Sequence, residues 1–148
     1  MNNNNSQLEA ILRHEIPLTE FMGIEVFKYN GKTLSLRAPL APNINHKSTA
    51  FGGSLYSLAV LAGWGFLYLK FQEKDLASTI VIHNSHISYD RPVSGEIVAT
   101  CMAPEDKELE KFFTIYERKG KARISLHSII MHDMQTAVTF TGNYVAHR

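Results

Sequence analysis

Residues 43–59, NINHKSTAFGGSLYSLA, combine the residue types of this chain that are best suited to chemistry. Gly52 and Gly53 stand directly before a long apolar run, and glycine lets a ligand approach the backbone closely. If a helix begins near Ser54, the N–H groups of its first turn lack partners within the helix, and the helix dipole adds partial positive charge. Such groups can hold a phosphate, or an oxyanion that develops on a carbonyl. A tight turn that packs the loop against the helix is the structural alternative.

The surrounding composition narrows the choice of ligand. TAFGGS lacks the lysine that follows the last glycine of a P-loop. The net charge of +1 provides no long-range field for nucleic acid, so we expect no nucleic-acid partner. His83 and His86 are three apart on a predicted strand and would point to opposite faces, and no other ligands cluster at a workable spacing. We therefore expect no metal and no separate cofactor.

The elements that must position this loop follow from the apolar pattern. Residues 6–16 predict an amphipathic helix, because apolar side chains recur at spacings of three and four, at Leu8, Ile11, Leu12 and Ile16. Ser6 and Glu9 match a capping box, and Pro17 ends the helix. The asparagine-rich residues 1–7 are expected to be disordered.

The apolar period then changes to two, which is typical of strands. Asn30-Gly31 joins two alternating runs and predicts an antiparallel hairpin. The apolar run 55–69 predicts a buried helix, since a membrane span needs about 20 residues and this run lies mid-chain. Further strands are predicted over 78–93, 95–104 and 135–147. We interpret 111–132 as a long hairpin that turns at residues 119–121.

We therefore expect one α+β domain over residues 1–148, in which a curved antiparallel sheet wraps a long central helix. A helix that is apolar on every face must be covered all round, and one curved sheet covers one side only. A second copy would cover the rest, so we expect a homodimer or a tetramer. Cys101 is the one cysteine and is interpreted as a buried, inert thiol. With no visible signal peptide, these features predict a cytoplasmic protein without membrane insertion.

The element order and the glycine loop resemble the hotdog fold of the thioesterase superfamily. Phenylacetyl-type members read Asn, six residues, then Gly-Gly, and the residues in register here are Asn45, Thr49, Ala50, Gly52, Gly53, Leu55, Leu58 and Ala59. YDRPVSGEIVA, residues 89–99, resembles a strand entry of the superfamily, and KSTAFGGSLYSLAVLAGWG is similar to the YiiD C-terminal-like thioesterase group. The resemblance spans about residues 18–146. It implies an enzyme acting on acyl thioesters of coenzyme A or acyl carrier protein, whose pantetheine arm is part of the substrate.

Two positions depart from the family pattern. Phe51 stands where those relatives have a histidine, and Val60 stands where they carry a catalytic aspartate. Residues 26–72 contain no Asp or Glu, so the carboxylate that would activate water or attack the carbonyl is missing from this helix. A partner subunit would have to supply one. Asp90 and Glu96 are candidates in principle, although their context predicts a turn.

Asn45 and Gly53 are then the predicted catalytic groups, because an amide and a backbone N–H can both donate to a thioester oxygen. His46, beside Asn45, is a candidate proton donor. These groups suit thioester hydrolysis, and they also suit decarboxylation of a malonyl thioester, which needs only that the enolate be held. Some relatives are associated with malonyl-carrier-protein decarboxylation in starting fatty-acid synthesis. A non-catalytic acyl-thioester binding module and a structural partner of an acyltransferase are further alternatives.

The remaining candidate residues are expected to bind the substrate. They are Phe51, Gly52, Ser54, Ser57, His83, Tyr89 and Arg91. The resemblance places residues 89–91 near the pantetheine arm, where Arg91 could meet a phosphate. The basic segment RKGKAR, residues 118–123, could dock the 3′-phosphate of coenzyme A or an acidic carrier protein.

Overall fold

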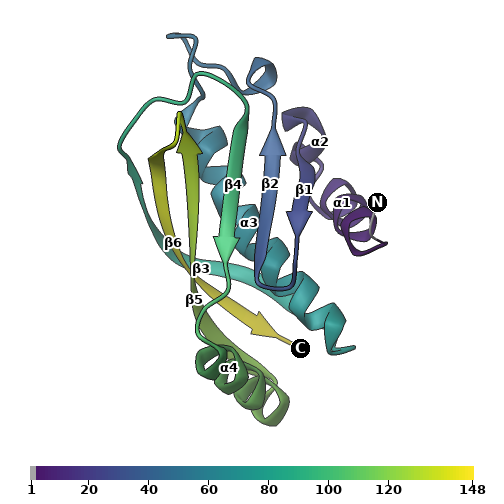
Figure 1. Ribbon diagram of the computed structural model, residues 1–148. Coiled ribbons are helices and arrows are strands. Elements are labelled where there is room, and N and C mark those ends of the chain that lie inside the picture. Colours follow the sequence, from purple (N-terminus) through teal and green to yellow (C-terminus); the bar gives the residue numbers. More distant parts are fainter. Residues whose placement is uncertain (1–2) are drawn as a thin grey trace.

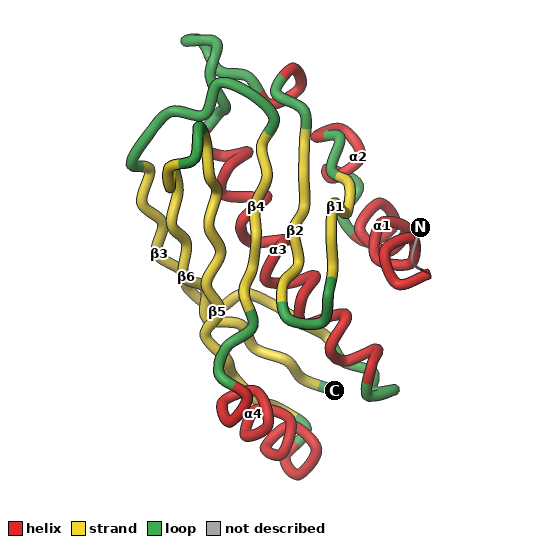
Figure 2. Tube along the Cα trace, viewed as in Figure 1, coloured by secondary structure: helices red, strands yellow, loops and turns green. Residues whose placement is uncertain are grey.

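The computed structural model describes residues 3–148. Its helices are α1 (Asn3–Glu15), α2 (Leu18–Met22), α3 (Gly52–Glu73) and α4 (Asp106–Lys119), with a 3-10 turn η1 (Ala41–Asn43). Its strands are β1 (Glu25–Tyr29), β2 (Thr33–Ala38), β3 (Thr79–Tyr89), β4 (Ile97–Met102), β5 (Lys121–His132) and β6 (Gln135–His147). Over these residues the strands form one six-stranded antiparallel sheet in the order β1-β2-β4-β5-β6-β3, which curves around α3 (Figure 1; Figure 2). The predicted α+β architecture is therefore confirmed.

Helix α1 begins earlier than the sequence pattern predicts. It starts at Asn3, so residues 3–7 are helical where disorder was expected. Residues 1 and 2, which belong to the same expected segment, lie outside the residues that the structure describes. Ser6 accordingly lies inside the helix and not at its N-cap. The helix ends at Glu15, before Pro17, as predicted, and buries its apolar side against β1 and α3.

The hairpin of β1 and β2 forms where Asn30-Gly31 predicts it. The Asn30 Oδ1 accepts hydrogen bonds from the backbone N–H groups of Lys32 (2.9 Å) and Thr33 (2.8 Å). Gly31 has φ +87°, which an L-residue rarely adopts. The turn is therefore fixed by local chemistry that can be read from the sequence.

Helix α3 is the core of the fold. With 22 residues, α3 is by length and composition apolar enough to cross a membrane. However, 56% of an apolar 18-residue stretch of this helix is buried within the chain. It contacts the strands β2 to β6. At Gly63 a side chain would overlap Tyr144, whose hydroxyl donates to the Val60 carbonyl at 2.7 Å. These contacts make α3 a core helix, as predicted, although it extends beyond both ends of the apolar run.

One stripe of α3 is only half-buried within the single chain. Its residues are four apart, and they are Tyr56, Val60, Trp64 and Tyr68. Tyr56 and Trp64 hydrogen-bond to β3, and Tyr56 and Val60 also line a cavity beside α2. Trp64 and Tyr68 stack with ring centroids 5.5 Å apart, and the Trp64 indole N–H donates to the Ile80 carbonyl. β3 itself is the last strand of the sheet and pairs on one side only, with β6.

The interpretation of residues 111–132 as a hairpin is wrong. Residues 106–119 form helix α4, and Gly120, at φ +73°, is its left-handed C-cap and not a hairpin turn. The helix buries Phe112, Phe113 and Tyr116 against Phe71 at the end of α3. The ring centroids of Phe71 and Tyr116 are 4.8 Å apart in an edge-on arrangement, which favours aromatic packing.

Candidate active site

Asn45 organises the loop that leads to α3. Its Oδ1 accepts from the backbone N–H groups of Lys47 (2.8 Å) and Thr49 (3.1 Å), and its own N–H donates to the Thr49 carbonyl (2.7 Å). Its Nδ2 donates to the Thr49 Oγ1 at 3.0 Å and reaches the Ala50 carbonyl only at 3.4 Å. Four hydrogen bonds of ordinary length thus shape the loop, while one Nδ2 hydrogen of Asn45 is weakly held.

Asn43 is a buried structural residue that the sequence analysis did not single out. It is 2% exposed, and its Nδ2 donates to the carbonyls of Met22 (2.9 Å) and Pro39 (2.8 Å). Its carbonyl accepts from the Phe51 N–H at 2.7 Å. Its Oδ1 is buried with no partner among the described residues. Asn43 therefore joins α2, the end of β2 and the start of α3.

The first N–H groups of α3 precede the intrahelical hydrogen bonds. Phe51 is the N-cap residue, and its carbonyl accepts from Ser54 (2.9 Å) and Leu55 (3.0 Å). The N–H groups of Gly52 and Gly53 lie in the first turn, before the first carbonyl of the helix that could accept from them. They lie at the positive end of the helix dipole. A side chain at Gly53 would overlap the Phe51 ring, which lies over it. Gly53 therefore leaves room for the Phe51 ring in this position, and any side chain there would displace the ring.

A cavity of about 300 Å³, the loop pocket, lies between the Asn45 loop, the start of α3 and the end of β3. Asn45, Gly52, Tyr89, Asp90 and Arg91 line it. The Tyr89 hydroxyl donates to the Gly52 carbonyl at 3.0 Å and so ties β3 to α3. Burial, with a smaller contribution from Tyr56, raises the pKa of Tyr89, so the phenol keeps its proton.

An apolar groove lies on the other side of the helix start, between α2 and α3. It consists of two cavities of about 360 Å³ and 180 Å³ that share Leu18, Met22 and Ser57. Phe51 and Gly53 line the larger cavity. Helix α2 presents exposed apolar side chains here, with Phe21 78% exposed. We call this feature the α2–α3 groove.

The predicted site residues divide between these two cavities. The loop pocket is lined by Asn45, Gly52, Tyr89 and Arg91. The α2–α3 groove is lined by Phe51, Gly53, Ser54 and Ser57. Asn45 and Gly53, which were expected to share one oxygen, therefore line different cavities, and Gly52 is the glycine beside Asn45. His46 and His83 are exposed and line neither cavity.

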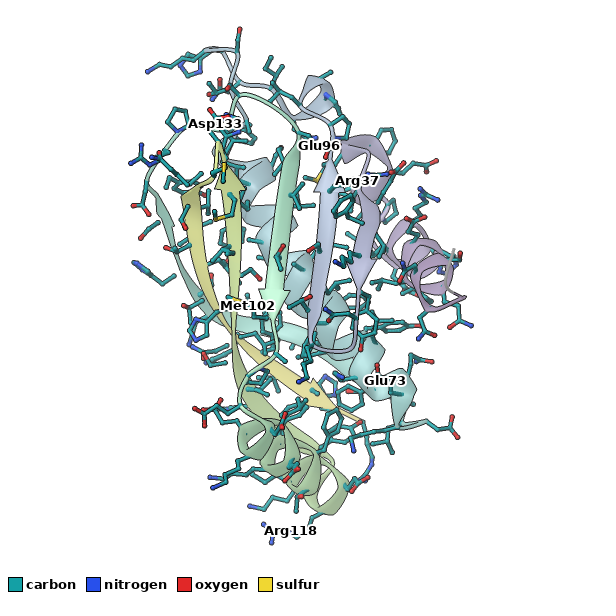
Figure 3. The ribbon with its side chains drawn as sticks, viewed as in Figure 1. Arg37, Glu73, Glu96, Met102, Arg118 and Asp133 are labelled. Carbon is teal, nitrogen blue, oxygen red and sulfur yellow. The ribbon has the colours of Figure 1, made fainter. Side chains whose placement is uncertain are left out.

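Asp90 is the site residue that sequence reasoning set aside. Asp90 does lie in a turn, directly after β3, as its sequence context predicts. The fold places this turn beside the start of α3, so that Asp90 lines the loop pocket. Glu96, the other candidate acid, is exposed just before β4 (Figure 3). It is not among the residues that line the loop pocket. Burial raises the pKa of the Cys101 thiol to about 12, so this cysteine is inert. Among the described residues, no group of three His, Cys, Asp or Glu could hold a metal ion.

A curved antiparallel sheet around a long helix, with the helix start facing a cavity, defines this protein as a member of the hotdog-fold thioesterase class. The chain belongs to the family described as "Putative thioesterase (yiiD_Cterm)", whose family model matches residues 5–148.

Solved structures agree with this assignment. The chain is 45% identical to a protein of unknown function from Chlorobaculum tepidum, with a TM-score of 0.94 over 97% of this chain and 94% of that one. It is 31% identical to a "putative thioesterase" from Shewanella oneidensis, with a TM-score of 0.91 and full coverage of both chains, 100% each. A "probable thioesterase" from Pseudomonas aeruginosa, 19% identical over 96% of this chain and 94% of that one, shares the fold with a TM-score of 0.81.

Proposed function

We propose that this protein hydrolyses acyl thioesters of coenzyme A or acyl carrier protein, with the thioester carbonyl bound at the start of α3. The observation that carries this proposal is the loop pocket. It brings the Gly52 end of the helix, the Asn45 amide and the Asp90 carboxylate to one cavity. A thioesterase family chain with such a cavity has the parts that acyl transfer to water needs.

The oxyanion of the transition state would be held by backbone and amide donors. The Gly52 N–H and the helix dipole favour negative charge on the carbonyl oxygen. The second Nδ2 hydrogen of Asn45 is available, because its 3.4 Å contact with Ala50 is longer than an ordinary N–H···O hydrogen bond. Gly53 would then make room for the Phe51 ring. Its N–H would donate a hydrogen bond only to a ligand in the α2–α3 groove.

The acyl chain would lie in the α2–α3 groove. The groove is apolar, is open to solvent, and adjoins the helix start through Phe51 and Gly53. Arg91, at the rim of the loop pocket, would face the pantetheine arm or its phosphate. In this arrangement the thioester lies near Phe51, between an apolar chain site and a polar arm site.

Decarboxylation of a malonyl thioester is the second candidate, favoured by one observation. Helix α3 has no acid before its last residue, and Val60 stands in the middle of its half-buried stripe. In this reaction the malonyl carboxylate leaves as carbon dioxide, the donors at the helix start hold the enolate, and a proton from water gives the acetyl thioester, because His46 does not line the cavity. A non-catalytic acyl-thioester binding module would bind the same substrates without turnover.

We propose a homodimer as the working assembly, with a tetramer as a larger form. The half-buried stripe of α3 and the unpaired edge of β3 lie side by side and support this proposal. Val81, 45% exposed on β3, adds apolar surface there. Light scattering after size-exclusion chromatography measures the assembly, and a monomer at micromolar concentration would contradict it.

Mass spectrometry of reaction products tests the function. The protein is incubated with acetyl-, octanoyl-, palmitoyl- and malonyl-coenzyme A, and with the matching acyl carrier proteins. Release of free thiol and fatty acid supports hydrolysis. Conversion of the malonyl thioester to the acetyl thioester supports decarboxylation instead. Binding without either product would support the binding module and contradict both enzymatic proposals.

A further inference from the structure

Attack of water on a thioester needs a base close to the carbonyl, and α3 supplies none. Residues 26–72 contain no Asp or Glu, and the first acid of α3 is its last residue, Glu73. At a rise of about 1.5 Å per residue, Glu73 lies about 30 Å from Gly52. Figure 3 shows Glu73 at the far end of the helix. A base for the loop pocket must therefore come from another element.

Asp90 is an acid that the fold brings to that place. It directly follows the last residue of β3 and lines the loop pocket together with Asn45, Gly52 and Arg91. Asp90 is exposed, and across residues 3–148 its carboxylate has no hydrogen-bond or ion-pair partner. The carboxylate is therefore not committed to a structural role and is available to a water molecule in the cavity.

Backbone hydrogen bonds fix the position of Asp90. The N–H groups of Asp90 and Arg91 both donate to the Ala137 carbonyl, at 2.8 Å and 3.2 Å. The Ala50 N–H donates to the Val93 carbonyl at 2.7 Å, which joins the turn after Asp90 to the loop before α3. The turn is thus held by β6 on one side and by the glycine loop on the other. Such support keeps a catalytic group at a constant distance from its substrate.

We propose that Asp90 is the general base of thioester hydrolysis, an assignment that rests on the function proposed above. The carboxylate takes a proton from a water molecule while the water oxygen bonds to the carbonyl carbon, and the Gly52 N–H holds the oxyanion. When the carbon–sulfur bond breaks, the proton passes from Asp90 to the departing thiolate. The products are a carboxylic acid and a thiol, which account for the water consumed.

The experiment compares the parent with Asp90→Asn and with Glu96→Gln as the matched control. Asp90→Asn keeps the shape of the side chain but cannot accept the proton. Glu96→Gln removes the same charge a few residues away, outside the loop pocket. With the best acyl-coenzyme A substrate, kcat should fall about 10²–10⁴-fold in Asp90→Asn. KM should stay within about threefold, and the control within about twofold of the parent in both constants.

Chemical rescue provides a readout that a structural role would not give. In Asp90→Ala, added formate should enter the vacated space and restore part of kcat in a saturable way. The same formate should not help Asp90→Asn, whose amide fills that space. Thermal unfolding of each variant should match the parent, since the exposed carboxylate has no partner to lose.

The outcomes separate this assignment from the function on which it rests. A loss confined to the Asp90 variants, with formate rescue of Asp90→Ala, supports the base. If the parent hydrolyses thioesters and Asp90→Asn keeps its kcat, the hydrolase stands and the base is overturned. A loss without rescue, or an equal loss in Glu96→Gln, also overturns it. If the parent releases no thiol from any substrate, the proposed function fails and the assignment fails with it.

Discussion

The substitution Asn43→Ala should destabilise the fold more than Asn45→Ala, although the two residues stand in the same polar loop. Asn43→Ala leaves the Met22 carbonyl buried without its donor, which costs about 1–3 kcal/mol. It also removes the donor to the half-buried Pro39 carbonyl, worth about 0.5–1.5 kcal/mol. Loss of the unpartnered Oδ1 offsets part of this cost. We therefore expect a net loss of about 2 kcal/mol in the free energy of unfolding.

Urea denaturation followed by circular dichroism measures this difference. Asn45→Ala exposes its former partners to water, so its cost should be about 1 kcal/mol. For a chain of this size, Asn43→Ala should also lower Tm by about 4–8 °C. A loss below about 1 kcal/mol for Asn43→Ala, or equal losses for both variants, would refute the view that Asn43 holds α2, β2 and α3 together.

Three further predictions concern other parts of the chain. Phe112→Ala should cost about 3–5 kcal/mol in urea denaturation, because it opens the aromatic cluster around Phe71. Burial raises the pKa of Cys101 from 9.0 to about 12, so the unfolded chain loses this proton first as pH rises. Unfolding free energy should thus fall between pH 9 and 11 more steeply than in Cys101→Ala, by up to about 1.4 kcal/mol per pH unit; equal slopes would contradict this. Reversing Lys119 and Lys121 to Glu should raise KM for carrier-protein substrates at low salt, and unchanged kinetics would leave this segment as solvated surface.

The parts of the fold that depend on local chemistry could be predicted. The Asn30-Gly31 hairpin needs only its own side chain and a positive φ, and both are visible in the sequence. The central helix could be predicted because its apolar run is long and unbroken. Its ends could not, since Gly52 and Glu73 lie outside that run and are set by the loop and by contacts with other elements.

Helix α4 was missed although the sequence carries its signal. Its apolar residues recur with helical spacing, at Leu109, Phe112, Phe113 and Tyr116, with acids in the first turn and Gly120 after the last. The aromatic and β-branched composition of the segment favoured a strand, and Gly120 between two lysines favoured a hairpin turn. The helical period and the C-cap glycine were the stronger evidence.

The candidate site could be predicted only in part, because its cavities are made by distant segments. Asn45 and Gly52 are neighbours along the loop, and their meeting follows from the sequence. Asp90 reaches them through Tyr89, whose hydrogen bond to Gly52 spans 37 residues. Asn45 and Gly53 line different cavities, and no local pattern in the sequence specifies that division.

These observations suggest how a thioesterase fold can operate without an acid on its central helix. The chemistry requires a carboxylate near the helix start, and it does not matter which element carries it. The turn after β3 is attached to that start by the Tyr89 and Ala50 hydrogen bonds, so an acid at position 90 reaches the same cavity. An acid at Val60 would place a charge in the half-buried apolar stripe beside Trp64, where desolvation is costly. With Asp90 as the base, position 60 stays apolar, which suits the α2–α3 groove that Val60 lines as well as burial of the rest of the stripe against a second copy of the chain.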